Sequence, residues 1–254
     1  MCVMCVRRAP PQHEGAEILL AVDLVPGYRE LPPPSTVREV VDCLWVRVTQ
    51  AGDEVRVLPD ASADIVWRQG VGTTLVGPDT SAKLLTYDES AVVVGMRLRP
   101  GAAGSVVGVP LEQVRDLRVD VAEINRRFDL DAELAPTHVI SSFVAAAAER
   151  QGDPLVTEAV RRLARDDVRA VAGDLAISER QLLRRFQASV GYGPKTLARV
   201  LRFRRFLDAV DSGKTNLARL ALDAGYADQA HLTRETTRLA GMTPQALIRS
   251  RSHS

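Results

Sequence analysis

Hydrophobic and β-branched residues recur in short runs through the first hundred residues, beginning near Ile18. Six runs stand out, at residues 40–48, 55–58, 65–67, 73–76, 84–87 and 92–98. Turn-forming residues separate these runs, including Gly52-Asp53, Pro59-Asp60 and Gly77-Pro78-Asp79. Each run has the composition of a β-strand, and strands at this spacing are typical of a barrel or a sandwich. The pattern therefore predicts a β-rich N-terminal domain.

A helical pattern replaces the strands from about Ser105. Residues 137–151 are rich in alanine, and Gly152-Asp153-Pro154 interrupts them. Asp153 can cap a following helix, and Pro154 suits its first turn. Short helices are predicted from there to about Arg249. We therefore predict an α+β protein, with a β-barrel-like domain and trailing helices over residues 1–152 and an all-α domain over residues 153–254.

The pattern near the start of the C-terminal domain predicts two helices with a capped turn between them. Residues 168–176 place apolar side chains along one side of a short helix. Ser178 and Gln181 then have the spacing of a capping box, in which each side chain accepts a hydrogen bond from the backbone of the other residue. A second helix therefore starts within a few residues, which is the arrangement of a helix-turn-helix unit.

The second of these helices has two distinct faces. Leu182 and Phe186 share one face at about 100° per residue, and we expect this face to pack inward. The opposite face carries guanidinium and amide groups, with one leucine at its edge: Arg180, Arg184, Gln187 and Leu183. Most such patterns belong to solvated amphipathic helices. The position after a short helix and a capped turn favours a recognition helix that reads base edges in the major groove.

The same arrangement is repeated fifty residues later. Residues 217–224 form a short predicted helix capped by Thr215 or Asn216, and residues 225–227 form the turn. Asp228 can cap a helix that runs to about Ala240. Its predicted outward face, which we expect to contact bases, consists of Gln229, Ala230, Thr233 and Arg234.

A basic helix is predicted between the two units, from Pro194 to about Val210. As one rigid rod it would hold two recognition helices about one turn of DNA apart, roughly 34 Å. We expect basic side chains of this helix and of the second unit to contact phosphates, which adds affinity but little sequence information. These are Lys195, Arg199, Arg202, Arg205 and Arg238.

The net charge of +1 hides an asymmetry between the two halves. From Pro154 onward lie 18 of the 33 Lys and Arg residues but only 10 of the 32 Asp and Glu residues, a net of +8, which leaves −7 for residues 1–153. A basic half of this size suits a polyanion such as DNA, although a solvated Arg-rich surface would give the same count. No apolar run approaches the roughly 18 residues that cross a bilayer. Because arginines follow the first apolar residues, the order is the reverse of a secretory signal, and we expect a cytoplasmic protein.

Candidate chemistry is sparse. None of the four histidines, His13, His138, His231 and His253, lies among the predicted strands, and no phosphate loop or nucleophile motif is found. We therefore predict no enzymatic activity, no metal and no cofactor. Cys2 and Cys5 have metal or redox spacing but lack a second pair of ligands, and chance explains them better. An effector pocket could be lined by Asp64, Trp67 and Arg97, with Asp60 nearby, but a core position for Trp67 is the simpler interpretation.

Residues 175–186, LAISERQLLRRF, followed by GYGP at 191–194, resemble the first half of an AraC/XylS-type DNA-binding domain. Residues 221–229, ALDAGYADQ, with GMTP at 241–244, resemble its second half more closely. The match covers roughly residues 154–249. One departure is Thr236, where this family usually has phenylalanine at a core position. The N-terminal half resembles, more weakly, cupin-like domains that bind small effectors or mediate dimerisation in this family.

The resemblance implies a sequence-specific transcriptional regulator that reads two adjacent major-groove segments of double-stranded DNA. It leaves open a small-molecule effector, a contact with RNA polymerase and a homodimer. The alternative is a small-molecule-binding or dimerisation protein whose DNA binding is weak or lost. DNA affinity that neither falls with salt nor depends on sequence would favour that alternative.

Overall fold

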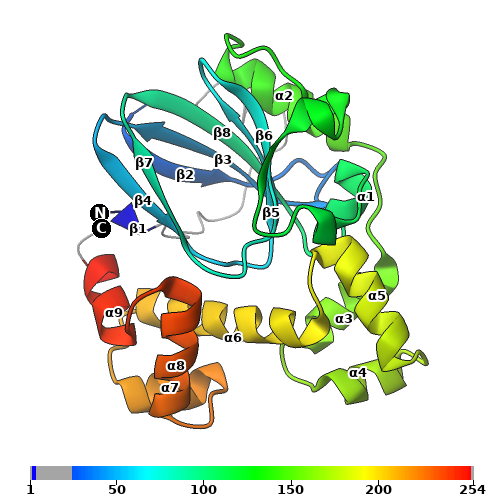
Figure 1. Ribbon diagram of the computed structural model, residues 1–254, viewed down its shortest axis with the longest axis vertical. Coiled ribbons are helices and arrows are strands. Elements are labelled where there is room, and N and C mark those ends of the chain that lie inside the picture. Colours follow the sequence, from blue (N-terminus) through cyan, green and yellow to red (C-terminus); the bar gives the residue numbers. More distant parts are fainter. Residues whose placement is uncertain (1, 4–24, 253–254) are drawn as a thin grey trace.

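The computed structural model describes residues 2–3 and 25–252 of the chain. Two β-sheets form the N-terminal half, and helices form the C-terminal half, so the α+β prediction is confirmed. In Figure 1 the sheets lie above a long horizontal helix, α6 (Pro194–Asp211), which joins two groups of shorter helices. No helix among the described residues has the length and apolarity required to cross a membrane.

The larger sheet has six strands, and every neighbouring pair in it is antiparallel. Its strands, in spatial order, are β2 (Gly27–Leu31), β3 (Val41–Thr49), β8 (Ala91–Leu98), β5 (Ala63–Arg68), β6 (Gly72–Val76) and β9 (Arg118–Asp120). The smaller sheet comprises β1 (Cys2–Val3), β4 (Asp53–Val57) and β7 (Lys83–Tyr87). All six strands expected from the sequence are present. The two sheets are not joined into a closed barrel by the described strands, so the barrel-like prediction holds only loosely.

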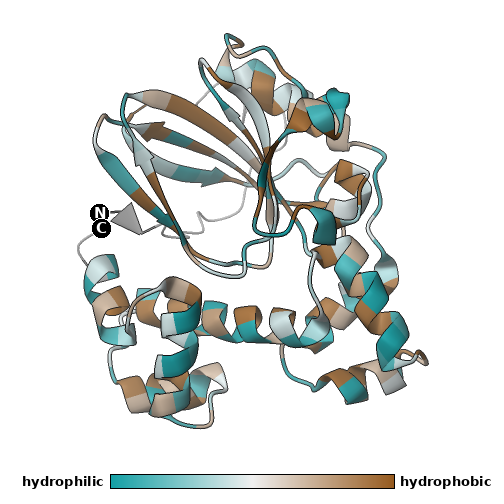
Figure 2. Cartoon of the chain, in the orientation of Figure 1, coloured by the Kyte–Doolittle hydropathy of each residue, from teal (hydrophilic) through white to brown (hydrophobic). Residues whose placement is uncertain are grey.

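Each face of the six-stranded sheet covers a different core. On β5, burial alternates with the period of two expected for a strand, which turns Ile65 and Trp67 toward one face. That face is covered by α1 (Ala103–Val107), α2 (Pro136–Ala147) and three 3-10 turns, η1 (Leu111–Gln113), η2 (Val121–Glu123) and η3 (Arg126–Phe128). Trp45 and Val93 point to the other face, where they pack against Val55 and Tyr87 of the smaller sheet. Figure 2 shows hydrophobic residues recurring along these strands.

The C-terminal half consists of α3 (Pro154–Arg162), α4 (Val168–Asp174), α5 (Glu179–Val190), α6, α7 (Leu217–Ala224), α8 (Gln229–Ala240) and α9 (Pro244–Ser252). The predicted caps are confirmed. The Asp153 side chain accepts hydrogen bonds from two N–H groups of α3, and Ser178 and Gln181 form a complete capping box on α5. Asp228 accepts from the N–H of His231 at the start of α8. Of the two candidate caps for α7, Asn216 is the one that bonds the helix.

The two halves share a buried core. Leu58 and Ala61 come from the loop after β4, yet they pack among the apolar side chains of the C-terminal helices. The backbones also approach closely at Gly104 of α1, where an added Cβ would lie 2.5 Å from the carbonyl oxygen of Ala188 on α5. The helix-turn-helix units are therefore packed on the N-terminal half, and α5 in particular lies against it.

Candidate nucleic-acid interface

Helix α5 presents a basic face to solvent. Leu182 and Phe186 are fully buried in the C-terminal core, as the helical projection predicts. Arg180 and Arg184 are exposed, Leu183 is 41% exposed and Gln187 is half-buried. Neither Arg180 nor Arg184 has an ion-pair partner within the described chain. The two guanidinium groups thus retain their full capacity to bond an acceptor.

Helix α8 follows the same plan. Leu232 and Leu239 are buried, while Gln229, Ala230 and Arg234 are exposed. Thr233 is half-buried, and its hydroxyl donates to the carbonyl oxygen of Gln229 at 2.9 Å. His231, which we did not expect to be a ligand, packs its ring edge-on against Tyr226 with 5.3 Å between centroids. The predicted base-reading residues of both helices therefore lie on the outer faces of their helices.

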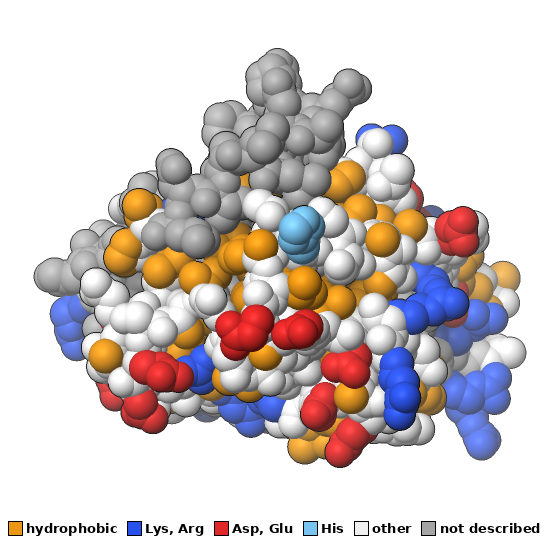
Figure 3. Space-filling view, turned by 90° about the horizontal axis from the view of Figure 1, so that it is seen from above, with side chains coloured by type: hydrophobic (Ala, Val, Ile, Leu, Met, Phe, Trp, Pro, Cys, Tyr) orange, Lys and Arg blue, Asp and Glu red, His pale blue; other side chains and the backbone are white. Residues whose placement is uncertain are grey.

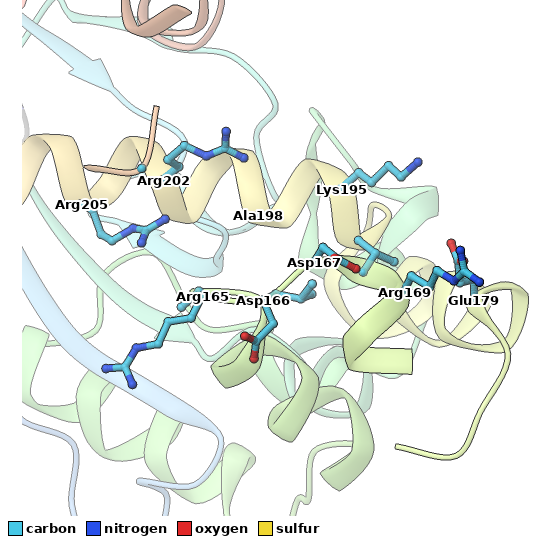
Figure 4. A pocket seen from close by; sticks show the side chains of 13 residues that line it. Arg165, Asp166, Asp167, Arg169, Glu179, Lys195, Ala198, Arg202 and Arg205 are labelled. Atoms are coloured by element: carbon cyan, nitrogen blue, oxygen red, sulfur yellow. The ribbon is translucent and has the colours of Figure 1, made fainter. Parts of the chain in front are cut away.

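A basic groove runs along α6 between the two helix-turn-helix units. It has a volume of about 590 Å³ and is lined by residues of the α3–α4 loop, α4, α5, α6 and the turn at Gly225. Figure 4 shows its charged side chains, which include five cations and three anions: Arg165, Arg169, Lys195, Arg202, Arg205, Asp166, Asp167 and Glu179. The groove therefore has a net positive lining and adjoins the first residue of α5.

None of the four arginines of this groove has a carboxylate partner among the described residues, and two of them lie near each other on α6. The Arg202 guanidinium lies over the ring of Tyr226, 5.6 Å from its centroid. Partial burial and the neighbouring Arg202 lower the pKa of Arg205. An anion placed between them would relieve this repulsion, and a DNA phosphate is such an anion.

The other predicted phosphate contacts differ from one another. Lys195 lies at the rim of the groove, and Arg238 is exposed near the end of α8. Arg199 is paired with Glu235 at 2.7 Å, so it joins α6 to α8 and its charge is already balanced. Among the predicted phosphate contacts, Arg199 is therefore the weakest candidate.

Thr236 occupies a core position of α8, as the sequence predicts. It is 0% exposed, and its hydroxyl has no hydrogen-bond partner in the described part of the chain. A buried hydroxyl without a partner costs free energy, because it has lost its bonds to water. The second unit therefore carries a local defect in the core position of α8.

The C-terminal ends of both recognition helices are held by the N-terminal half. Arg56 of β4 donates to the carbonyl oxygen of Ala240 at 3.2 Å. The backbone N–H of Ala82 donates to the carbonyl oxygen of Leu239 at 2.7 Å. Arg115 donates to the carbonyl oxygen of Gly191, just past α5, at 3.5 Å. These contacts leave the N-terminal, base-facing turns of α5 and α8 exposed.

The candidate effector residues do not form one pocket. Trp67 is fully buried on the helix-covered face, where its indole N–H donates to the carbonyl oxygen of Asp131. Arg97 is buried beside three carboxylates, those of Glu30 at 2.9 Å, Asp60 at 3.1 Å and Asp64 at 3.4 Å. Asp64 lines a cavity between the two sheets, and neither Trp67 nor Arg97 lines that cavity. Their role toward an effector stays a prediction.

One guanidinium cannot neutralise three carboxylates. Burial, opposed by Arg97 and reinforced by Asp60, raises the pKa of Asp64 to about 7. The same environment raises the pKa of the Cys43 thiol beyond its ordinary range, mainly through burial. Cys43 is therefore a buried, protonated thiol. Cys5, His13 and His253 lie outside the described residues.

Charge is distributed unequally over the surface. Figure 3 views the N-terminal half from the side opposite to the helix-turn-helix units, and acidic and apolar side chains are prominent on this face. The basic groove and the exposed arginines belong to the C-terminal half. The charge split seen in the sequence is therefore also a split in space.

Two family models match separate parts of the chain. Residues 29–120 match a domain of unknown function, DUF6597, and residues 171–250 match a helix-turn-helix domain. The second match contains both recognition helices and the helix that joins them. The first covers most of the two sheets.

A protein of Streptomyces lividans, described as an AraC-like transcription regulator, is 35% identical to the chain over 122 residues. The aligned part is 45% of this chain and 38% of that protein, so the chain spans well under half of its relative.

Two crystal structures of ToxT from Vibrio cholerae match most of the chain, with low sequence identity and low TM-scores. That of strain O395 is 12% identical with a TM-score of 0.46, and covers 82% of this chain and 97% of its own. The structure of ToxT with a bound unsaturated fatty acid is 13% identical with a TM-score of 0.44, and the match covers 82% of this chain and 95% of that one. Both TM-scores are below 0.5, which is too low to transfer a function.

Proposed function

This chain belongs to the AraC/XylS family through its C-terminal helix-turn-helix domain, and on that premise we propose that it is a sequence-specific DNA-binding transcriptional regulator. Helix α5 reads one segment of the major groove and α8 reads the next. The 18-residue α6 spans roughly 27 Å at 1.5 Å per residue, which suits two heads placed about one helical turn of DNA apart.

The observation that carries this proposal is the set of exposed, unpaired guanidinium groups on the outer faces of two capped helices. Arg180 and Arg184 of α5 and Arg234 of α8 have no carboxylate partner among the described residues. Arginines on a solvated helix commonly find i,i+4 partners, as Arg162 does with Glu158. Guanidinium groups left without them favour an external acceptor, and guanine offers two acceptors in the geometry of arginine.

The basic groove on α6 supplies the sequence-independent part of the affinity. Two of its unpaired cations, Arg202 and Arg205, lie between the two reading heads, where the DNA backbone would pass. Each phosphate contact releases condensed counter-ions, so binding weakens with salt. Residues 1–152 regulate this activity in our proposal, through an effector or by pairing two chains. A contact with RNA polymerase follows if the regulator raises transcription.

In-vitro selection of random duplex DNA by the full-length chain tests the proposal. The expected result is an enriched motif of two blocks about one helical turn apart. A single block would restrict reading to one unit. No enrichment, together with an affinity that is independent of salt, would refute a DNA-binding regulator and favour a module that binds only small molecules.

A further inference from the structure

A cavity lies between the two sheets of the N-terminal half. It has a volume of about 330 Å³. Most of its lining is apolar or aromatic, with Trp45 of β3, Val55 of β4, and Leu85 and Tyr87 of β7. A space of this size, lined mostly by apolar groups with a few polar ones, has the character of a small-molecule site.

The charged groups in the lining are not equivalent. Asp64 faces Arg97, Arg68 faces Glu89 at 3.5 Å, and Arg118 forms two hydrogen bonds to Asp79 at 2.6 and 2.7 Å. The fourth charged group, Arg47, has no carboxylate within 4 Å among the described residues. The lining therefore holds one cation that no carboxylate of the described residues balances.

Arg47 is also deeply buried. The residue is 5% exposed, and its Nη2 has no hydrogen-bond partner in the described part of the chain. Its guanidinium lies over the ring of Tyr28, 4.9 Å from the centroid, which stabilises the cation without using its N–H groups. A buried cation whose N–H donors have no acceptor costs free energy, and a bound anion would offset that cost.

Trp45 provides a second donor beside it. Trp45 and Arg47 are two residues apart on β3, and side chains at that spacing point to the same face of a strand. The indole Nε1 of Trp45 is buried and has no partner among the described residues. An added Cβ at Gly95 would lie 1.9 Å from the Trp45 ring, so this glycine makes room for the ring on the sheet. Two adjacent unsatisfied donors thus line one apolar cavity.

We propose that this cavity binds a small ligand with an apolar body and one anionic group, and that Arg47 and Trp45 bond the anion. The apolar body lies against the valine, leucine and tyrosine side chains of β4 and β7. Arg118 does not recognise the anion, because it is held by two hydrogen bonds to Asp79, and the charge of Arg68 is offset by Glu89 at 3.5 Å. The ligand class follows from Arg47, the one lining cation without a carboxylate partner among the described residues: a monoanion such as a carboxylate fits beside it.

The ligand site is connected to the DNA-binding half by one strand. Val55 and Val57 of β4 line the cavity, while Arg56 between them bonds Ala240 at the end of α8. The residues that follow β4 include Leu58 and Ala61 of the C-terminal core, and the carbonyl oxygen of Asp60 accepts from Arg204 of α6 at 3.1 Å. If the protein binds DNA as proposed, the ligand regulates that binding, and β4 transmits its effect to the C-terminal half.

Calorimetric titration of the full-length chain tests the site with three probes that share one apolar body. These are 4-phenylbutanoate, 4-phenylbutan-1-ol and 4-phenylbutan-1-amine. We expect the anion to bind at least tenfold more tightly than the alcohol, and the amine to bind most weakly. Equal binding of the three probes, or binding of none, would overturn the proposal.

Variants distinguish recognition of the anion by Arg47 from a general effect of the protein's net charge. Arg47→Met should remove the preference for the anion, Arg47→Lys should keep part of it, and Arg38→Met, an equal loss of charge at an exposed position, should leave it unchanged. Arg47→Met should melt no lower than the parent chain, because it removes a buried cation without a counter-ion. An Arg47→Met chain that is folded and still prefers the anion would contradict our assignment.

A separate measurement tests whether the ligand changes the affinity for DNA. The affinity for the selected DNA should change at least threefold when 4-phenylbutanoate saturates the parent chain, and should not change in Arg47→Met. An unchanged affinity with the probe bound would refute the connection through β4. Probe binding needs no DNA, so failure of the DNA selection with intact probe binding would refute the proposed function and leave the ligand site standing.

Discussion

The Arg56 guanidinium donates a hydrogen bond to the carbonyl oxygen of Ala240, the last residue of α8, across 3.2 Å. A strand of the N-terminal half therefore caps the C-terminal end of the second recognition helix. A cation at this end also complements the negative end of the helix dipole. The orientation of α8 depends on a residue 184 positions away in the sequence.

Loss of this contact should weaken the second reading head more than the first. Arg56→Met is expected to lower affinity for a two-block DNA site several-fold, because α8 becomes less fixed, while affinity for a site with the α5 block alone stays the same. Fluorescence anisotropy with the two duplexes measures the difference. A parallel fall on both duplexes would indicate a general loss of folding or charge instead.

Removal of a base-reading arginine should have an effect that depends on sequence. Arg184→Ala is expected to cost about 1–3 kcal/mol on the selected site, and much less on random DNA. Arg38→Ala removes the same charge from an exposed position of the N-terminal half and serves as the control. An equal loss on every duplex would assign Arg184 to a phosphate.

The defect at Thr236 can be repaired by a change of nearly equal volume. Thr236→Val removes the buried hydroxyl that has no partner, and should raise the free energy of unfolding by about 1 kcal/mol. The same change at the exposed neighbour, Thr237→Val, should be nearly neutral. Urea unfolding of the two variants gives the comparison, and a destabilised Thr236→Val would mean that the hydroxyl is satisfied after all.

The contact between α5 and the N-terminal half can be probed with two glycines that have nearly the same φ angle. Gly191 has φ +89° and an added Cβ there would lie 2.5 Å from Cγ of Pro78, whereas Gly213 has φ +86° and nothing within 4 Å. Alanine costs about 1–2 kcal/mol at either position for the left-handed conformation. Gly191→Ala should cost roughly 1–3 kcal/mol more, through the clash. Equal losses in thermal unfolding would show that Pro78 moves aside.

Stability should fall with rising pH because of Asp64. Its folded-state pKa of about 7 lies above the ordinary value of 3.8, so the folded chain holds this proton more tightly than the unfolded chain. The free energy of unfolding contributed by this group therefore declines as pH rises from about 4 to 7. Asp64→Asn should flatten the profile over that window, and Asp88→Asn at an exposed position should not. A profile that Asp64→Asn leaves unchanged would place the retained proton on another group of the Arg97 cluster.

Local signals were enough to predict most of the helical half. Capping residues such as Ser178 and Asp228 act on their own helix, and the inward faces of α5 and α8 follow from a period of 3.6. The strand runs were also found, since hydrophobic alternation is a local property. β2 and β9 were not among the predicted runs; β9, with three residues, is too short to show a period and forms only by pairing with β6.

The candidate ligand site could not be predicted in the same way. Trp67 and Arg97 drew attention as unusual residues within strands, but the face on which each one lies depends on the pairing of two sheets. Nothing in the sequence distinguishes Arg47 from other arginines. Only the three-dimensional arrangement shows that Arg68 and Arg118 are paired, whereas Arg47 has no carboxylate partner among the described residues.

Leu58 and Ala61 give the C-terminal helices part of their interior from outside their own segment. A hybrid regulator that joined these helices to a foreign sensor domain would have to bring a matching loop, or leave a hole among Phe203, Phe206 and their neighbours. The two halves of this protein are therefore expected to fold as one unit, and changes on either side of that loop are expected to be accepted in compensating pairs.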